Sequence, residues 1–217
     1  VPAAGRDVLT ALGGSRVGMA VSWPKTILSK GEMRSQFYHL IDVAPTILEA
    51  ASIPQPKQVN GFRQKSMDGV SMLASFKSAN APENHLTQYF NVFGNRGIYH
   101  NGWLAGTVHN LPWLNYAKLP TLEEDKWELY DLRSDFASAT DLASSNPEKL
   151  KEMKSIFNRE AIKYKVYPID DRKAERVVAQ TAGRPDLMEG RKEMTFYPGM
   201  SGIFEFPIIS VKNTEFW

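Results

Sequence analysis

The sequence predicts an α+β unit, in which an antiparallel four-stranded sheet packs on one long helix. Three observations carry this prediction: β-prone runs joined by two-residue turns at residues 88–107, a further β-prone run at 127–132, and an amphipathic helical pattern that begins at Asn146. A short apolar run and a helix signal also lie within residues 17–51.

The first element is a short strand. Residues 17–23 read VGMAVSW and are followed by a proline, which is the pattern of a buried strand that a proline closes. Residues 40–51 (LIDVAPTILEAA) then predict a strand-to-helix transition, with Asp42 placed to cap the helix. The apolar residues that share one face of this helix are Val43, Ile47 and Ala50.

The sheet is predicted from local turn chemistry. Gly94-Asn95 and Asn101-Gly102 separate three β-prone runs, and such pairs suit the type II′ and I′ turns whose twist matches a hairpin. A fourth run, WELYDL, can add one more strand. The four runs lie at residues 88–93, 96–100, 103–107 and 127–132.

The long helix is predicted to begin at Asn146-Pro147, because asparagine is a good N-cap and proline is tolerated at the first helical position. Its opposite face interleaves lysines with glutamates, which is typical of a solvated face rather than a nucleic-acid site. The apolar stripe recurs at steps of three and four through Leu150, Met153, Phe157, Ala161 and Tyr164.

Composition excludes several kinds of site. The 217 residues hold 26 Lys and Arg against 24 Asp and Glu, and the net charge of +2 is too small to indicate a nucleic-acid partner. Cysteine is absent, so disulfides, thiolate metal sites and a cysteine nucleophile are excluded within the chain. No apolar run approaches the ~18 residues of a membrane-spanning helix, and we expect no membrane span.

The histidines and one acidic pair are the first candidates for chemistry. His39, His85, His100 and His109 lack the spacing of a metal-binding motif, so hydrogen-bonded structural roles are favoured, and His100 flanks a turn from which it could face a cleft. Asp170-Asp171-Arg172 suits either a hard cation such as calcium or a surface ion pair.

An ordered series of strings resembles the C-terminal half of a type I sulfatase. The strings are GGSRVGMAVSWP, GEMRSQFYHLIDVAPTILEAASIPQP, VNGFRQKSMDGVSML, TQYFNVFGNRGIYHNGWLAGT, WELYDLRSDFASATDLA and KYKVYPIDDR. Taken together they are similar to bacterial arylsulfatases of the alkaline-phosphatase superfamily, and the resemblance covers roughly residues 10–200.

The resemblance implies three parts. Residues 1–85 would be the C-terminal part of the large α/β sulfatase domain, with late strands and helices of its sheet. Residues 86–168 would be the small antiparallel-sheet and helix subdomain. Residues 169–217 would be a polar wrapping segment and the start of a β-rich C-terminal region.

The chemistry that the resemblance implies is sulfate-ester hydrolysis by a formylglycine nucleophile with a calcium ion. The formylglycine is made within a Cys/Ser-x-Pro-x-Arg motif, and the stretch Ser52-Ile53-Pro54-Gln55-Pro56 has proline where arginine is required. We therefore expect neither cofactor to be held by this chain, and we expect it to be inactive alone. The alternative is a non-catalytic sulfatase-like binding or assembly module, motivated by the apolar run at 202–210.

Four residues are carried over as site candidates. Arg6 lies seven residues before Gly13, near the place where relatives carry a sulfate-binding lysine. Asn95, Arg96 and His100 lie in the stretch that approaches the substrate pocket in relatives, and hydrogen bonding within the turn and sheet explains them equally well. No metal ligand is assigned.

The expected partners follow from the same resemblance. The chain begins at Val1 and ends in an aromatic, strand-like run, so we expect a piece of a longer protein whose partner is the missing N-terminal half. Exposed strand edges could also join two copies in a homo-oligomer. The sequence does not decide the compartment, although the resemblance suggests the periplasm or secretion.

Overall fold

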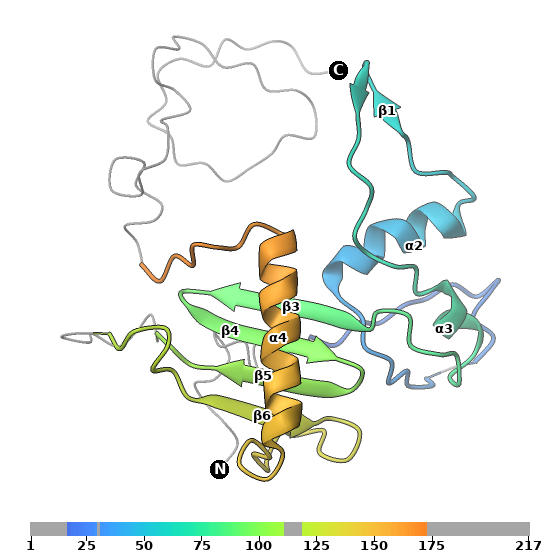
Figure 1. Ribbon diagram of the computed structural model, residues 1–217. Coiled ribbons are helices and arrows are strands. Elements are labelled where there is room, and N and C mark those ends of the chain that lie inside the picture. The colour runs from blue at the N-terminus through green and yellow to red at the C-terminus, as the bar shows by residue number, and fades with distance from the viewer. Residues whose placement is uncertain (1–16, 30, 111–118, 173–217) are drawn as a thin grey trace, which may run out of the picture. The chain divides into compact units, whose positions relative to one another are not determined.

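The computed structural model describes residues 17–29, 31–110 and 119–172 (Figure 1). The chain divides into two units, residues 1–171 and 172–217, and every element below belongs to the first. Arg6 and the apolar run at 202–210 lie outside the described residues. No helix within the described ranges is long and apolar enough to cross a membrane.

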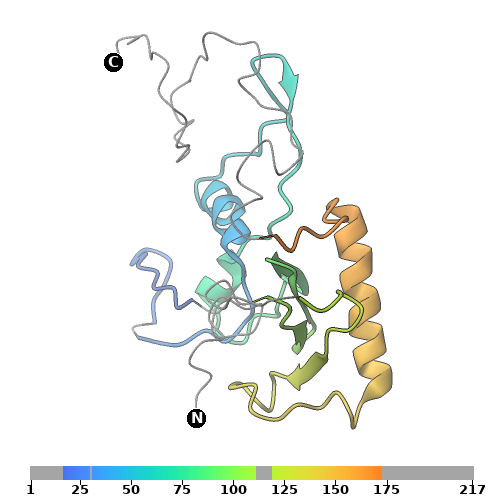
Figure 2. The ribbon, with the colours of Figure 1, turned by 90° about the vertical axis from the view of Figure 1, so that its left-hand side faces the viewer.

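The predicted four-stranded antiparallel sheet and long helix are confirmed. The strands pair in chain order, and helix α4 (Pro147–Lys163) lies across one face of the sheet (Figures 1 and 2). The strands are β3 (Thr87–Val92), β4 (Asn95–His100), β5 (Trp103–Thr107) and β6 (Trp127–Asp131).

The first hairpin turn lies one residue earlier than predicted. Its central residues are Phe93 and Gly94, both with positive φ (52° and 82°), whereas Asn95 begins β4 opposite Val92. The cause of the shift is a tertiary contact. The fully buried side chain of Asn95 accepts hydrogen bonds from the backbone of residues 109 and 110, which follow β5. The second turn is where the sequence predicts it, with positive φ at Asn101-Gly102.

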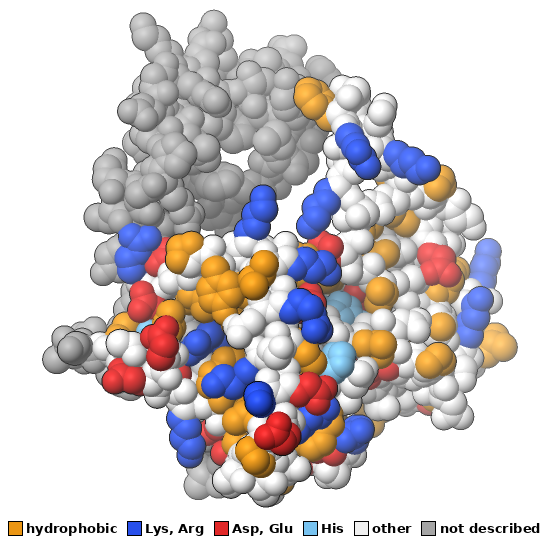
Figure 3. All heavy atoms as spheres, in the orientation of Figure 1, with side chains coloured by type: hydrophobic (Ala, Val, Ile, Leu, Met, Phe, Trp, Pro, Cys, Tyr) orange, Lys and Arg blue, Asp and Glu red, His pale blue; other side chains and the backbone are white. Residues whose placement is uncertain are grey.

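The core lies between the sheet and α4, and the predicted apolar stripe supplies Met153, Phe157 and Ala161 to it. Phe157 is 1% exposed and meets the ring of Trp127 edge-on at 5.7 Å. The buried residues of this core are Ile98, Ala105, Trp127, Leu129, Met153, Ile156, Phe157 and Ala161. The outer face of α4 carries lysines with glutamates among them (Figure 3), as in the pair between Lys149 and Glu152 at 2.9 Å.

Asn146 precedes α4 as predicted, but its side chain does not cap the helix. The amide nitrogen of Asn146 donates instead to the Ser145 hydroxyl at 3.0 Å. The start of the helix therefore depends on Pro147, whose fixed φ suits the first turn and which has no N–H to satisfy.

The predicted strand at residues 17–23 is wrong. These residues form no strand, and the side chains of Val17 and Met19 are 86% and 56% exposed. An apolar strand needs a neighbouring edge for its backbone, and no described strand pairs with this segment. The described elements before the four-stranded sheet are η1 (Leu40–Asp42), α2 (Val43–Ala50), β1 (Gln58–Val59), β2 (Phe62–Arg63) and α3 (Leu73–Lys77).

Helix α2 lies where the sequence predicts a helix, although Asp42 plays a different part. Its carboxylate accepts the His39 N–H at 2.8 Å and so closes a capping box around η1, not α2. The buried residue of α2 is Thr46, whose hydroxyl donates to the Asp42 carbonyl at 2.6 Å. Ile47, on the predicted apolar face, is 61% exposed.

Residues before α2 are fastened to the face of the sheet opposite α4. The ring of Phe37 stacks on that of Tyr99 with centroids 3.9 Å apart, and Tyr99 packs with Leu104 and Tyr130. Glu83 accepts both the Phe37 N–H at 2.9 Å and the Tyr99 hydroxyl. This small cluster holds the segment that leads into η1 against the sheet.

Truncating Phe157 tests the core. We expect Phe157→Ala to lower the free energy of unfolding by about 3–5 kcal/mol, because it leaves a cavity between α4 and the sheet. Urea denaturation followed by circular dichroism measures this. The matched control is Ile162→Ala on the same helix, which is 71% exposed and should change stability by no more than about 0.5 kcal/mol. Equal losses in both variants would contradict the assignment of the core.

Candidate functional site

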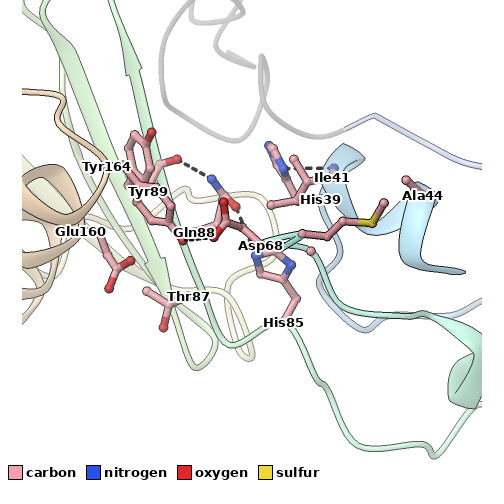
Figure 4. Close-up of a pocket in the computed structure, with 12 residues that line it drawn as sticks. His39, Ile41, Ala44, Asp68, His85, Thr87, Gln88, Tyr89, Glu160 and Tyr164 are labelled. Carbon is pink, nitrogen blue, oxygen red and sulfur yellow. Dashed lines mark hydrogen bonds between the residues drawn. The ribbon is translucent and has the colours of Figure 1, made fainter. Parts of the chain in front are cut away.

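A cleft of about 460 Å³ lies beside the first strand of the sheet (Figure 4). It brings together the start of α2, the segment before α3, strand β3 and the C-terminal end of α4. His85, two residues before β3, also lines it. The side chains and backbone that line it come from His39, Ile41, Ala44, Met67, Asp68, Gly69, His85, Thr87, Gln88, Tyr89, Glu160 and Tyr164.

The cleft is built on a buried pair formed by Asp42 and His85. Nδ1 of His85 lies 2.7 and 2.9 Å from the two carboxylate oxygens of Asp42, and Asp42 itself is fully buried. The same carboxylate accepts the backbone N–H of His39 and of Val70, each at 2.8 Å. One side chain therefore joins η1, the segment before α3 and the segment before β3.

Gln88 fixes the other nitrogen of His85. Nε2 of His85 lies 3.1 Å from Oε1 of Gln88, and the amide nitrogen of Gln88 donates to the Tyr89 carbonyl at 2.7 Å. Both ring nitrogens of His85 thus face oxygen acceptors.

The environment shifts the pKa values of two groups here. Burial raises the pKa of Asp42, but the hydrogen bonds from His85, His39 and Val70 outweigh it and hold the pKa below its ordinary 3.8. Burial, followed by the charge of His85, lowers the pKa of His39. Asp42 is therefore a carboxylate at neutral pH, and His39 is a neutral imidazole beside it.

Two tyrosines form the opposite wall of the cleft. The rings of Tyr89 and Tyr164 stack with centroids 5.3 Å apart, and the Tyr164 hydroxyl donates to Asp68 at 3.3 Å. Burial raises the pKa of Tyr89, so its hydroxyl stays protonated. Asp68 is paired with Lys65 at 2.8 Å, and Glu160 lies 3.7 Å from Lys163.

Two of the predicted site residues, Asn95 and Arg96, do not line this cleft. The Asn95 side chain accepts the N–H groups of His109 and Asn110 at 2.6 and 3.0 Å and donates to the Asn110 carbonyl at 2.8 Å. Arg96 donates to the Leu122 carbonyl at 2.6 Å and is paired with the buried Asp125. Both residues fasten the connection between β5 and β6 to strand β4.

Asp125 continues this network to the end of the described chain. Nδ1 of His109 lies 3.0 Å from Asp125, and Nε2 of His109 lies 3.3 Å from Asp171. Asp171, a member of the acidic pair considered for calcium, is thus within hydrogen-bonding distance of a histidine. Among the described residues no three His, Cys, Asp or Glu side chains gather as a metal site.

His100 reaches the cleft indirectly. Its Nδ1 lies 2.7 Å from the hydroxyl of Thr87, which lines the cleft, and its Nε2 is 3.0 Å from the Asn101 amide. Burial lowers the pKa of His100. Whether Asn95, Arg96 and His100 also approach a substrate stays a prediction, as does the role of Arg6.

Comparison with known proteins decides the family. A family model described as "N-sulphoglucosamine sulphohydrolase, C-terminal" matches residues 13–166, well over half of the chain. The chain belongs to this sulfatase family. It corresponds to the C-terminal portion of a sulfatase, which confirms the resemblance inferred from the sequence.

Solved structures of larger proteins show partial likeness to this sulfatase portion. One was solved in connection with the metabolism of multiple glycosaminoglycans by Bacteroides thetaiotaomicron (18% identity, TM-score 0.42, 58% of this chain and 25% of that one). A second was solved with its substrate D-glucosamine-2-N,6-O-disulfate (18% identity, TM-score 0.46, 70% of this chain and 29% of that one). A third is Ps i-CgsB (18% identity, TM-score 0.44, 73% of this chain and 32% of that one). The chain thus spans between a quarter and a third of the length of these proteins.

Replacing Asp42 tests the buried pair. We expect Asp42→Asn to lower the free energy of unfolding by about 3–5 kcal/mol, because it leaves buried donors without their carboxylate. Urea denaturation at pH 7 measures the loss. Glu49→Gln, which removes an exposed carboxylate from α2, is the matched control and should stay within about 0.5 kcal/mol of the parent. A loss of that small size in Asp42→Asn would contradict the central role of the pair.

The lowered pKa of Asp42 predicts a pH dependence. A carboxyl whose folded-state pKa is depressed stabilises the fold above its ordinary pKa, and this stability is lost as the pH falls through the folded-state value. The stability difference between the parent chain and Asp42→Asn should therefore be full at neutral pH and shrink as the pH falls below 3.8. Urea midpoints across an acid series would show it. A difference independent of pH would contradict this assignment.

Proposed function

We propose that this chain is the C-terminal portion of an arylsulfatase-like enzyme that hydrolyses sulfate esters, and that it needs the N-terminal half of that enzyme for activity. The observation that carries the proposal is the family match over residues 13–166. The chain has no cysteine and no Ser-x-Pro-x-Arg motif, so it has no residue from which a formylglycine nucleophile could be made.

The proposed cofactors of the whole enzyme are calcium and formylglycine, and both belong to its other half. The described residues of this chain do not fit a metal ion, because no three acidic or imidazole ligands converge in them. The chain contributes instead the sheet, α4 and the surface of residues 17–62.

Exposed apolar side chains support a docking role for residues 17–62. Large apolar groups left exposed in a folded chain commonly mark an interface. Among the described residues, most of the exposed large apolar side chains lie in this segment. The most exposed of those in the segment are Val17, Leu28, Met33, Leu40, Ile47 and Phe62. The proposed partner that covers them is the N-terminal half of the sulfatase domain.

The four site candidates have different proposed roles, either contact with the substrate or support of the hairpin. Arg6 is proposed to bind a sulfate oxygen in the whole enzyme, where a guanidinium can donate two hydrogen bonds. His100 is half-buried and is proposed to line the substrate pocket. Asn95 and Arg96 support the hairpin that carries it through their buried hydrogen bonds.

The second candidate function is a non-catalytic module that binds a partner or a second copy of itself. The same exposed apolar side chains favour it, since they would serve any docking partner equally well. The two functions differ in what the upstream sequence must supply. A sulfatase requires the nucleophile motif and acidic metal ligands there, whereas a binding module requires neither.

Activity measurements test the sulfatase proposal. We expect the 217-residue chain alone to release no 4-nitrophenol from 4-nitrophenyl sulfate, and a longer protein that includes the upstream half to do so until EDTA removes its metal. Comparison with N-sulfoglucosamine distinguishes hydrolysis of an ester from that of a sulfamate.

Arg6→Ala in the longer protein should lower kcat/KM by at least about tenfold, the effect of losing ~1.4 kcal/mol of transition-state binding. Arg63→Ala, which removes an exposed arginine from β2, is the matched control and should leave kcat/KM unchanged. Turnover by the 217-residue chain alone would overturn the proposal. An inactive longer protein with no nucleophile motif would favour the binding module.

A further inference from the structure

Residues 57–64 form a short hairpin around strands β1 and β2, and local contacts hold its shape. The two central turn residues, Asn60-Gly61, both have positive φ (50° and 82°), as a type I′ turn requires. The Gln64 N–H donates to the Lys57 carbonyl at 2.9 Å, which extends the ladder beyond β1 and β2 by one more pair. The hairpin thus has a defined shape before any partner binds.

The two faces of this hairpin differ in chemistry. Val59 pairs with Phe62 and Gln58 pairs with Arg63, and successive side chains of a strand point to opposite faces. The face that carries Phe62, called the Phe62 face below, is therefore distinct from the face that carries Arg63. The members of the Phe62 face are Lys57, Val59, Phe62 and Gln64, and those of the other face are Gln58 and Arg63.

The Phe62 face is apolar at its centre, and the described residues leave it uncovered. Phe62 and Val59 are 75% and 45% exposed, and all four residues of β1 and β2 are exposed. Figure 1 shows β1 and its partner strand at the end of the arm that links α2 to α3. A lone two-stranded hairpin is only marginally stable in water, and large apolar groups left exposed commonly mark an interface. The Phe62 face therefore suits insertion into another surface.

The charge on the Phe62 face indicates what kind of surface would cover it. Lys57 is exposed, and no ion pair among the described residues includes it. The face carries no acidic residue, so a second copy of the chain docked through the same face would offer Lys57 no carboxylate. An apolar recess with a carboxylate at its rim complements this face better than the face complements itself.

We propose that the Phe62 face docks into an apolar recess, with a carboxylate at its rim, on the N-terminal half of the sulfatase domain. The choice of partner rests on the proposed function, in which that half covers residues 17–62. The hairpin lies within the residues that match the C-terminal family model. Phe62 fills the recess, Val59 packs beside it, and Lys57 pairs with the carboxylate. A preformed hairpin loses little conformational freedom on docking, so a small contact area is sufficient.

Hydroxyl-radical footprinting tests the docking by comparing the 217-residue chain with the longer protein that includes the upstream half. The radicals oxidise exposed side chains, and mass spectrometry measures how fast Phe62 gains oxygen. We expect Phe62 to be oxidised at least about tenfold more slowly in the longer protein, as for a docked state favoured by about ten to one. Ile162 on α4 is 71% exposed and is the reference side chain, which should react equally in both proteins.

Variants connect the protection to the Phe62 face. Lys57→Glu and Val59→Thr should each speed the oxidation of Phe62 in the longer protein by about threefold or more, and should leave it unchanged in the 217-residue chain. Val59→Thr keeps a branched side chain, so the hairpin is preserved while the apolar contact is weakened. Arg63→Glu reverses a charge on the other face of the same hairpin and is the matched control, with protection as in the parent.

Equal oxidation of Phe62 in the two proteins would overturn the proposal, and so would an Arg63→Glu variant that loses protection as fully as Lys57→Glu. Protection in the 217-residue chain alone that grows with its concentration would identify a second copy as the occupant, and would also overturn it. The measurement needs no turnover. An active longer protein with an unprotected Phe62 would therefore refute the docking alone, whereas a protected Phe62 in a longer protein that has no nucleophile motif would refute only the sulfatase proposal.

Discussion

The described fold depends above all on one buried carboxylate. Asp42 accepts hydrogen bonds from His85 and from the backbone of His39 and Val70, so three segments distant in sequence converge on it. A buried charge is costly unless hydrogen-bond donors surround it. Here the donors around Asp42 outweigh the effect of burial, so the pKa of its carboxyl lies below the ordinary value. The same contacts that make Asp42 tolerable therefore fix where η1, the segment before α3 and the start of β3 meet. The cleft is a consequence of that meeting.

A second polar centre performs the same task at the other end of the sheet. Asn95 and Asp125 gather donors from His109, Asn110 and Arg96, and this holds the connection between β5 and β6 on strand β4. In both centres a side chain offers two hydrogen-bonding groups: two carboxylate oxygens in an aspartate, or an oxygen acceptor and an N–H donor in an asparagine. These groups hold loop segments whose backbone is not paired in a helix or a sheet. The apolar core under α4 supplies the driving force for folding, and these polar centres determine how the loops are placed.

How far the sequence predicts this structure depends on the range of the interactions involved. The strands and α4 are predictable because turn residues and apolar spacing are local signals, as at Asn101-Gly102 and along the Phe157 stripe. The first hairpin turn is shifted because the side chain of Asn95 is hydrogen-bonded to residues about 15 positions away, which no local pattern reveals. The cleft is beyond local reasoning altogether, since His85 and Asp42 are 43 residues apart and neither carries a spacing signal. The apolar run at 17–23 misleads for the opposite reason: its pattern indicates a buried strand, but no described strand pairs with it.

The described chain thus combines a part that buries its own core with a part that does not. The sheet and α4 enclose Ile98, Leu129 and Phe157 almost completely, whereas α2 buries a threonine and leaves Ile47 exposed. The family match runs through both parts, so the exposed apolar side chains belong to the matched portion itself, and large apolar groups left exposed commonly mark an interface. Asp42 and His85 lie where these two parts meet, each belonging to one of them. The carboxylate that caps η1 is also the one that holds the segment before β3, so a single side chain joins the poorly buried part to the sheet.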